Sequence, residues 1–411
     1  MARACMVLMP WLDMPSSSRI TPAGSATLIP MSHPLHKAVS AAYEALTARV
    51  RDRVALPWHP NHEVVLSKMR GADGEAWEHC PKGALLRAVD LLAAKGLFVQ
   101  AGFELEFALF TQDGSNATQL TPYGRGTSYA LFDQMDMAGG FLDDVTVCLE
   151  QMGVEVAMVH AEASTGQYEV VLRHKAVLQA VQDVTLARMG IKAVARKHGL
   201  VTSFVPNFGD GLGGSGCHVH LSLDGHFGVG GGEGGKCGGV SETGQQWMAG
   251  ILAGLPWAMC VTNGSCLSYL RMLPMYWAGA YQVWGVDNKE AALRLAEDRS
   301  NVEVKALDSV SNVDLAMAGL LLAGLQGVEA GMELPEACQV DPHTVQAEVK
   351  RLPGTLEESV VEFEEAAQGG RLERVFTKEM VHEICSARVA EIEFVKKVGI
   401  KEFRKRMMTL H

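Results

Sequence analysis

The segment that most constrains the fold places two carboxylates inside an apolar run. It reads Gly102-Phe103-Glu104-Leu105-Glu106-Phe107-Ala108-Leu109-Phe110. On a β-strand, residues i and i+2 share a face, so the side chains of Glu104 and Glu106 point the same way. Neighbouring carboxylates in an apolar strand repel each other and lose hydration. A divalent cation would offset that cost. The alternative is a sheet edge with solvated glutamates.

Three later segments repeat carboxylates or imidazoles on predicted strands or at strand ends. They contain Glu162 with Glu169, then His218 with His220, and finally Glu303. Mostly oxygen ligands with one nitrogen suit Mg²⁺ or Mn²⁺ better than a structural zinc. Two such ions can bridge phosphate oxygens and a substrate carboxylate. The His-x-His pattern also occurs in metal-dependent hydrolases, but the later histidines lie in no convincing strand, which disfavours that class.

Phosphoryl transfer also needs positive side chains near the transferring group. Arg271, Lys289 and Arg294 lie in one segment between the second and the last acidic clusters. These three residues are candidates for that role, and the alternative for each is a solvated surface position.

The pattern of elements predicts an α+β protein. No regular βαβ rhythm and no internal repeat is present. Residues 1–35 are rich in Pro, Ser and Met and are expected to be irregular. The element pattern favours a domain boundary near residue 96. The main predicted elements are strands at 54–56, 63–66, 97–110, 201–205 and 216–223, and helices at 84–95, 139–152, 174–198, 315–326 and through most of 371–406.

Composition excludes several classes of protein. The net charge of -11 argues against a nucleic-acid binder. The nine cysteines are scattered and form no CxxC pair, which fits reduced thiols in a cytoplasmic compartment. The longest apolar run, Leu315–Leu325, is about half the length that a bilayer requires. The sequence leaves an organellar transit segment open.

The order of these segments resembles the glutamine synthetase superfamily. The resemblance runs from about residue 54 to the end of the chain. It rests on the glutamate strand Gly102–Phe110, Glu162–Glu169 (E-x-x-x-G-Q-x-E), Gly214–Leu223 (GSGxHxHxSL), Ser268–Pro274 (SYxRLxP), Asp287–Arg294 (DNRxAxxR) and Glu303–Leu315 (E-V-R-x-x-D-x-x-x-N-P-Y-L).

The resemblance implies a set of roles for these residues. One Mg²⁺ or Mn²⁺ is expected on Glu106, Glu162 and Glu169, and a second on Glu104, His218 and Glu303. ATP is expected against His220, Ser222, Lys289 and Arg294, and the amino-acid substrate against Gly214, Arg271 and Lys305. Arg271 and Arg294 are the expected catalytic residues. The family reaction is phosphorylation of the glutamate γ-carboxylate by ATP, followed by attack of ammonia on the acyl phosphate.

Several positions depart from the family pattern. Trp277 stands where glutamine synthetases carry a flap glutamate that helps to deprotonate ammonium. Lys289, Asn301 and Lys305 each replace an arginine, and the lysines lose the planar two-pronged geometry of guanidinium. The resemblance therefore leaves three functions open: a glutamate–ammonia ligase of glutamine biosynthesis, a γ-glutamyl ligase for a larger amine, and a non-catalytic regulatory or assembly protein.

Two short segments resemble one branch of the superfamily. Trp277-Ala278-Gly279 and Leu56-Pro57-Trp58 look like the nodulin and fungal developmental-regulator branch. The resemblance also implies a catalytic domain at 81–411 and a small β-grasp domain within residues 1–80, shortened relative to the family. It further implies a homo-oligomeric ring in which the small domain completes the neighbouring active site. The expected partners are otherwise small molecules: glutamate, an amine or ammonia, and ATP.

Overall fold

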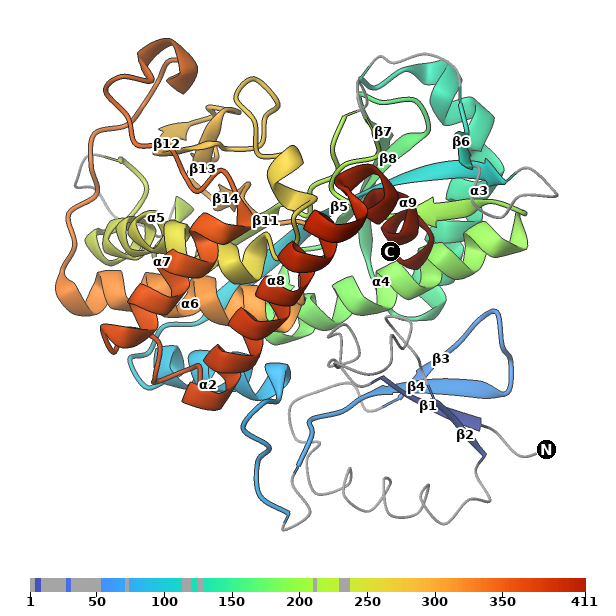
Figure 1. Ribbon diagram of the computed structural model, residues 1–411, viewed down its shortest axis with the longest axis horizontal. Coiled ribbons are helices and arrows are strands. Elements are labelled where there is room, and N and C mark those ends of the chain that lie inside the picture. The colour runs from blue at the N-terminus through green and yellow to red at the C-terminus, as the bar shows by residue number, and fades with distance from the viewer. Residues whose placement is uncertain are drawn as a thin grey trace.

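The computed structural model describes residues 4–8, 27–30, 53–70, 74–112, 120–124, 129–209, 213–228 and 237–411. Figure 1 shows a small N-terminal sheet beside a larger body of strands and helices. The helices are α2 (Pro81–Ala93), α3 (Phe132–Gln151), α4 (Val177–Lys197), α5 (Glu242–Thr262), α6 (Val313–Ala330), α7 (Leu356–Gln368), α8 (Lys378–Val398) and α9 (Ile400–Leu410).

Ten strands form the larger sheet, which confirms the α+β class. Its main path runs β12-β13-β14-β11-β5-β8-β7, and β6, β9 and β10 also pair with β5. These strands are β5 (Val99–Gln112), β6 (Leu120–Pro122), β7 (Val156–Ala161), β8 (Gln167–Leu172), β9 (Lys175–Ala176), β10 (Val201–Ser203), β11 (Val219–Leu223), β12 (Tyr281–Val286), β13 (Ala291–Leu295) and β14 (Val302–Val304). The resemblance implied antiparallel strands with flanking helices; the pairs along the main path are antiparallel except at one edge, where β12 and β13 pair in parallel.

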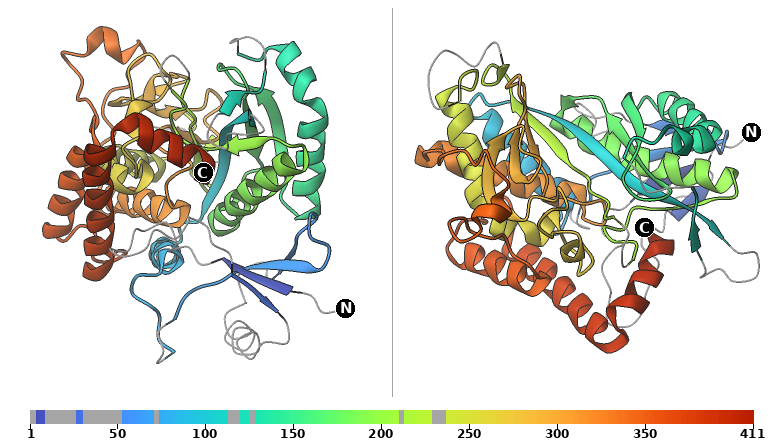
Figure 2. Two further views of the ribbon diagram at one scale, coloured as in Figure 1. Left: turned by 45° about the vertical axis from the view of Figure 1, so that its right-hand side comes forward. Right: turned by 90° about the horizontal axis from the view of Figure 1, so that it is seen from above.

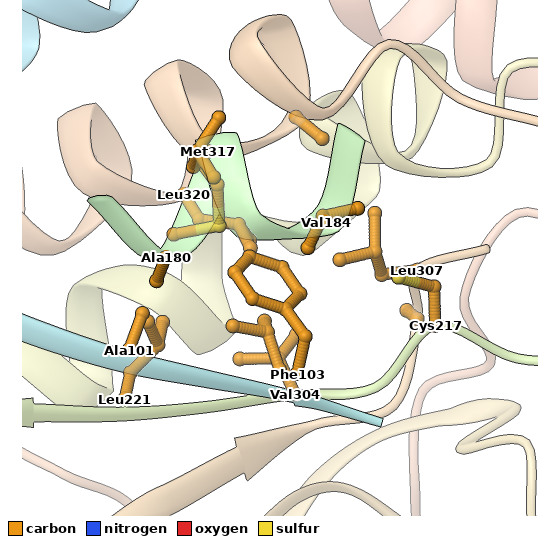
Figure 3. Packing of buried hydrophobic residues seen from close by; sticks show 14 of the residues in the cluster. Ala101, Phe103, Ala180, Val184, Cys217, Leu221, Val304, Leu307, Met317 and Leu320 are labelled. Carbon is orange, nitrogen blue, oxygen red and sulfur yellow. The ribbon is translucent and has the colours of Figure 1, made fainter. Parts of the chain in front are cut away.

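Strand β5 organises the fold because its two faces have different chemistry. The odd-numbered side chains Phe103, Leu105 and Phe107 are fully buried. Figure 3 shows Phe103 packed between the sheet and two helices, against Val184 of α4 and Met317 of α6. Aromatic rings of this size dominate the energetics of a core. The even-numbered face of β5, which carries Glu104 and Glu106, is thereby turned away from the helices.

Helix α6 forms the centre of the helical layer. It begins after Asn312, whose side chain accepts a hydrogen bond from the N–H of Leu315, and it ends at Gly331 in the left-handed conformation. The helix is long and apolar enough to cross a membrane by composition alone, but 67% of it is buried inside the protein, where it packs against α5 and α2. It is therefore a core helix.

The outer helices close the molecule on another side. Figure 2 shows α7 and α8 running together, with α9 turning away from the end of α8. Helix α9 packs against β10, and the N–H of Phe204 donates to the carbonyl of His411 at 3.0 Å. The predicted helical stretch 371–406 is thus confirmed from residue 378 onward.

The expectation that residues 1–35 are irregular is wrong for two segments. β1 (Ala4–Leu8) and β2 (Thr27–Pro30) join β3 (Val54–Ala55) and β4 (His62–Leu66) in a sheet of order β2-β1-β4-β3. β1 pairs in parallel with β4, a partner too distant in sequence for a local pattern to reveal. The β-grasp assignment and the boundary at residue 80 stay predictions.

Candidate active site

The register of the sheet aligns three charged or polar side chains in one row. Arg294 of β13 lies opposite Glu303 of β14, and Glu303 lies opposite His220 of β11. Opposite residues in an antiparallel pair share a face and lie close together. The next position in the row is Gly102 of β5. Glu104 stands two residues further along β5, and one donor atom each of Glu104, His220 and Glu303 lie within 4.8 Å of one another.

A second row crosses the other half of the sheet. Glu106 of β5 lies opposite Glu169 of β8, and Glu169 lies opposite His160 of β7. The Nε2 atom of His160 is 3.0 Å from Oε1 of Glu169. Glu162 follows β7 directly, and donor atoms of His160, Glu162 and Glu169 also lie within 4.8 Å of one another.

His218 joins the two rows. Its Nδ1 atom is 3.1 Å from Glu104, 3.3 Å from Glu303 and 3.8 Å from Glu106. Its Nε2 atom faces the guanidinium of Arg271 at 3.4 Å. Because Arg271 can only donate, Nε2 acts as the acceptor and the Nδ1 side faces the carboxylates.

The carboxylates of both rows are buried rather than solvated. The exposed fractions of Glu106, Glu169 and Glu303 are 7%, 4% and 2%. Strand β5 pairs with a neighbour on both sides, β11 and β8. The alternative of solvated glutamates on a sheet edge is therefore wrong.

Burial and repulsion between the carboxylates shift the pKa values of these groups. Burial first, and then the charges of Glu162 and Glu169, raise the pKa of Glu106 well above its ordinary value. Burial likewise raises the pKa of Glu169 to about 7. Around Glu104 burial acts in the same direction, but hydrogen bonds from His218 and His220 outweigh it and lower the pKa.

These donor sets fit two divalent cations. Each cluster offers carboxylate oxygens and an imidazole nitrogen at mutual distances short enough for one ion. A cation would neutralise the carboxylate charge that raises the pKa of Glu106. The first cluster contains two of the predicted ligands, Glu104 and Glu303, with His220 in the place expected for His218. The second contains Glu162 and Glu169. His218 and Glu106 lie beside these clusters, and the ligand roles of all six predicted residues stay predictions.

The predicted basic residues converge on the same face. Arg271 is buried and donates to the backbone carbonyls of Lys305 and Leu307. The ammonium of Lys305 is 2.6 Å from Glu303. Arg294 donates to Asp287 and, at 3.2 Å, to Glu303.

Two cavities open beside these residues. A cavity of about 460 Å³ is lined by most of the predicted site residues, namely Glu104, Glu106, Glu162, Glu169, Gly214, His218, Arg271, Lys289, Arg294, Glu303 and Lys305. A second cavity of about 570 Å³ is lined by His220 and shares Arg294 and Glu303 with the first. Ser222 is buried further along β11 and lines neither cavity.

Aromatic side chains stand at the rim of the first cavity. Trp277 and Tyr129 meet edge to face with ring centroids 6.2 Å apart. The ammonium of Lys289, predicted to contact ATP phosphates, lies 5.0 Å from the centroid of Trp277 and 5.9 Å from that of Tyr129. Its predicted role at the phosphates stays a prediction.

Sequence reasoning missed two residues of the site. His160 stands two positions before Glu162, the spacing that places two side chains on one strand face. Gln167 donates from Nε2 to Glu106 and to the carbonyl of Gly214, both at 3.0 Å. The signal for His160 was present in that spacing, whereas Gln167 has no signal apart from the family motif in which it occurs.

Comparisons with known proteins agree with this arrangement. The family model "Glutamine synthetase, catalytic domain" matches residues 78–405. Type-1 glutamine synthetase 1 of Dictyostelium discoideum is 30% identical over 332 residues, 75% of this chain and 66% of the relative. Gamma-glutamylpolyamine synthetase GlnA3 of Streptomyces coelicolor is 34% identical over 308 residues, 71% of this chain and 65% of the relative. The matched regions thus span just under two thirds of these two relatives.

Solved structures show the same fold. A novel glutamine synthase homolog superposes with a TM-score of 0.80 at 24% identity, over 100% of this chain and 99% of the other. A complex of GmaS with ADP superposes with a TM-score of 0.80 at 20% identity, over 99% of this chain and 96% of the other. The family model covers most of the chain, so this chain belongs to the family of the glutamine synthetase catalytic domain.

Proposed function

We propose that this chain is an ATP-dependent ligase that joins the γ-carboxylate of glutamate to ammonia or an amine through γ-glutamyl phosphate. The observation that carries the proposal is the pair of clusters, centred on Glu303 and Glu169, that converge with Arg271 and Arg294 on one cavity. Phosphoryl transfer depends on positioning and on neutralising charge, and this cavity offers both. Relatives with this domain include glutamine synthetases and a gamma-glutamylpolyamine synthetase.

The proposed reaction has two steps. A γ-carboxylate oxygen of glutamate attacks the γ-phosphorus of ATP, and ADP leaves. The neutral amine then attacks the acyl carbon, phosphate leaves and the nitrogen loses a proton. When bound, the two divalent cations supply positive charge against the phosphate oxygens.

The side chains of the chain itself have separable tasks in this scheme. The guanidinium of Arg294, at the junction of the two cavities, would stabilise charge on the transferring group. Arg271 is held by two backbone carbonyls and would orient the amino-acid substrate beside Gly214. His220 would lie against the nucleotide in the second cavity, with Ser222 on the same strand.

Trp277 favours a second acceptor, an amine larger than ammonia. It stands at the rim of the cavity with 46% of its surface exposed. A tryptophan cannot accept a proton from ammonium, whereas its face and edge can pack against an organic amine. This departure also supports the proposed place of the chain in the nodulin and fungal developmental-regulator branch.

The remaining expectations belong to the same proposal. We expect a homo-oligomeric ring and a β-grasp domain within residues 1–80. The cysteines whose side chains the structure describes are all free, which supports the expectation of a reducing, cytoplasmic compartment.

The test is phosphate release from ATP by the purified protein with glutamate, Mg²⁺ or Mn²⁺, and either ammonium or a panel of amines. We expect release that requires glutamate, metal and an amine. Glu104→Gln and Glu303→Gln should each lower the rate by at least about 100-fold, because each removes a charged ligand from the first cluster. Glu373→Gln, an exposed carboxylate on another part of the molecule, is the matched control.

A regulatory or assembly protein is the alternative from another class. The replacement of the flap glutamate by Trp277 is the observation that favours it. Binding of ATP and metal by calorimetry, with no phosphate release for any amine, would support this alternative and contradict the ligase.

A further inference from the structure

We propose that the acceptor is a primary monoamine with an apolar body, in preference to ammonia and to diamines or polyamines. This inference rests on the proposed ligase function and specifies its substrate class. It is carried by the contrast between an acidic floor and an apolar rim in the same cavity.

The floor of the cavity is made by the two carboxylate rows. The rim consists of five side chains with large exposed fractions: Tyr129, 48%; Met158, 52%; Met275, 68%; Tyr276, 56%; and Trp277, 46%. Exposed apolar side chains that gather around one cavity are typical of a binding surface. Ammonia would contact none of these rim side chains. An amine whose nitrogen reaches the floor would place its carbon chain against the rim.

The rim is held in place by a specific contact. Met275 and Trp277 both have positive φ angles, 68° and 52°, which residues with a side chain adopt at a cost. The carboxylate of Glu290 accepts a hydrogen bond from the N–H of each, at 3.2 and 3.1 Å. Because one carboxylate fixes both strained residues, the indole is positioned before a ligand arrives, which favours binding.

Lys289 decides between monoamines and diamines. Its ammonium already lies over the rings of Trp277 and Tyr129, at distances typical of a cation–π contact. A second ammonium at the far end of an amine would meet this like charge. Among the described residues that line the cavity, the carboxylates belong to the floor, and both oxygens of Glu290 are engaged by the backbone.

The experiment compares kcat/KM for ammonium, methylamine, butylamine and 1,4-diaminobutane, measured as phosphate release at saturating glutamate and ATP. Butylamine and 1,4-diaminobutane have the same carbon chain and differ in the distal ammonium. We expect kcat/KM for butylamine to exceed that for methylamine and that for ammonium by about tenfold or more, since each buried methylene contributes a factor of about four. We expect kcat/KM for butylamine to exceed that for 1,4-diaminobutane by about tenfold, because the distal ammonium of the diamine faces Lys289.

Three variants assign these preferences to residues. Lys289→Met removes the charge but keeps the length, and should close the gap in kcat/KM between butylamine and 1,4-diaminobutane. Trp277→Ala should lower kcat/KM for butylamine about tenfold and leave methylamine unaffected. Glu290→Ala should lower kcat/KM for butylamine as Trp277→Ala does, because the indole of Trp277 is no longer held in place. Glu290→Gln keeps one acceptor oxygen and should restore part of the preference for butylamine.

The outcomes separate this inference from the proposed function. No phosphate release with any of the four amines would contradict the ligase itself. If kcat/KM for ammonium or methylamine equals or exceeds that for butylamine, the ligase function holds and the inference is overturned. A preference for 1,4-diaminobutane would also overturn it, as would a Lys289→Met variant that raises the KM for ATP and leaves the amine preference unchanged.

Discussion

The ammonium nitrogen of Lys305 lies 2.6 Å from Oε1 of Glu303, and both side chains are buried. The same carboxylate also faces Arg294 at 3.2 Å and His218 at 3.3 Å. Burial alone would raise the pKa of Glu303, but nearby cationic side chains, Lys305 above all, outweigh it and hold the pKa at about 2. Glu303 is thus the meeting point of the cationic side chains in the site.

Removing the ammonium should therefore destabilise the protein when no metal is added. For Lys305→Met we expect a loss of about 2 kcal/mol in the free energy of unfolding, because a buried carboxylate loses one of its partners. Added Mn²⁺ should raise Tm more in this variant than in the wild type, since the cation compensates the freed charge. Thermal unfolding with and without Mn²⁺ measures both effects. Lys305→Arg keeps the charge and serves as the control, and equal metal-free Tm values for Lys305→Met and wild type would contradict the prediction.

Gly214 should not tolerate a side chain. A Cβ atom at this position would lie 2.5 Å from the carbonyl oxygen of Pro206 and 2.5 Å from Cγ of Arg271. Gly214→Ala is expected to cost about 1–3 kcal/mol of stability and to raise the KM for glutamate at least about tenfold by displacing Arg271. The matched control is Gly139→Ala in α3, where a Cβ meets no atom within 4 Å. If Gly214→Ala and Gly139→Ala have the same stability and the same KM, the packing argument fails.

A carboxylate in place of Trp277 should shift the acceptor toward ammonium. Trp277→Glu restores the residue type that the family carries at the flap and supplies an acceptor for the proton of ammonium. We expect kcat/KM for ammonium to rise about tenfold or more, and kcat/KM for butylamine to fall. Trp277→Gln, which has the same shape but no charge, should lower butylamine turnover without raising that of ammonium. Equal behaviour of the Glu and Gln variants would contradict a proton-accepting role.

His411 should contribute to destabilisation by acid. It is 6% exposed, and burial, reinforced by the charges of Arg188 and Lys192, lowers its pKa to about 3. Its ordinary pKa is about 6.5. As the pH falls below that value, the imidazole is protonated in the unfolded chain but stays neutral in the folded protein. The stabilising contribution is complete above pH 6.5 and is lost toward pH 3, by about 1.4 kcal/mol per pH unit.

The check is the difference in Tm between pH 7.5 and pH 5 for the wild type and for His411→Phe. Phenylalanine keeps a ring of similar size in the buried position and does not titrate. The wild type should lose more stability than the variant over this interval, and equal losses would show that His411 does not carry this dependence.

Much of the architecture follows from local pattern. The apolar run around Glu104 predicted a strand at 97–110, and the structure places it two residues later with the same length, at Val99–Gln112. The predicted helices agree with α2, α4, α6 and α8 to within a few residues at most ends, because apolar spacing and end signals act within a few residues. Helix α3 begins at Phe132 rather than near 139, and it contains Gly139 and Gly140.

The features that the sequence did not predict were missed for other reasons. Strand β1 was missed because its partner β4 lies more than fifty residues away, and pairing over such a distance leaves no local signal. The parallel pairing of β12 with β13 was missed for another reason, since period-two alternation does not reveal strand direction. His160 was missed although it stands only two positions before Glu162.

The sequence by itself determined which side chains face the same way: Glu104 with Glu106 on one strand, and His218 with His220 on another. A strand has a period of two, so this information is local. Only the tertiary structure decided which strands are neighbours and in what register. Registers such as Glu303 opposite His220 and Arg294, and Glu169 opposite Glu106 and His160, bring distant residues into two clusters. The physical reason is that register depends on burying the apolar faces of all the strands against the helices at once, a condition that no single segment contains.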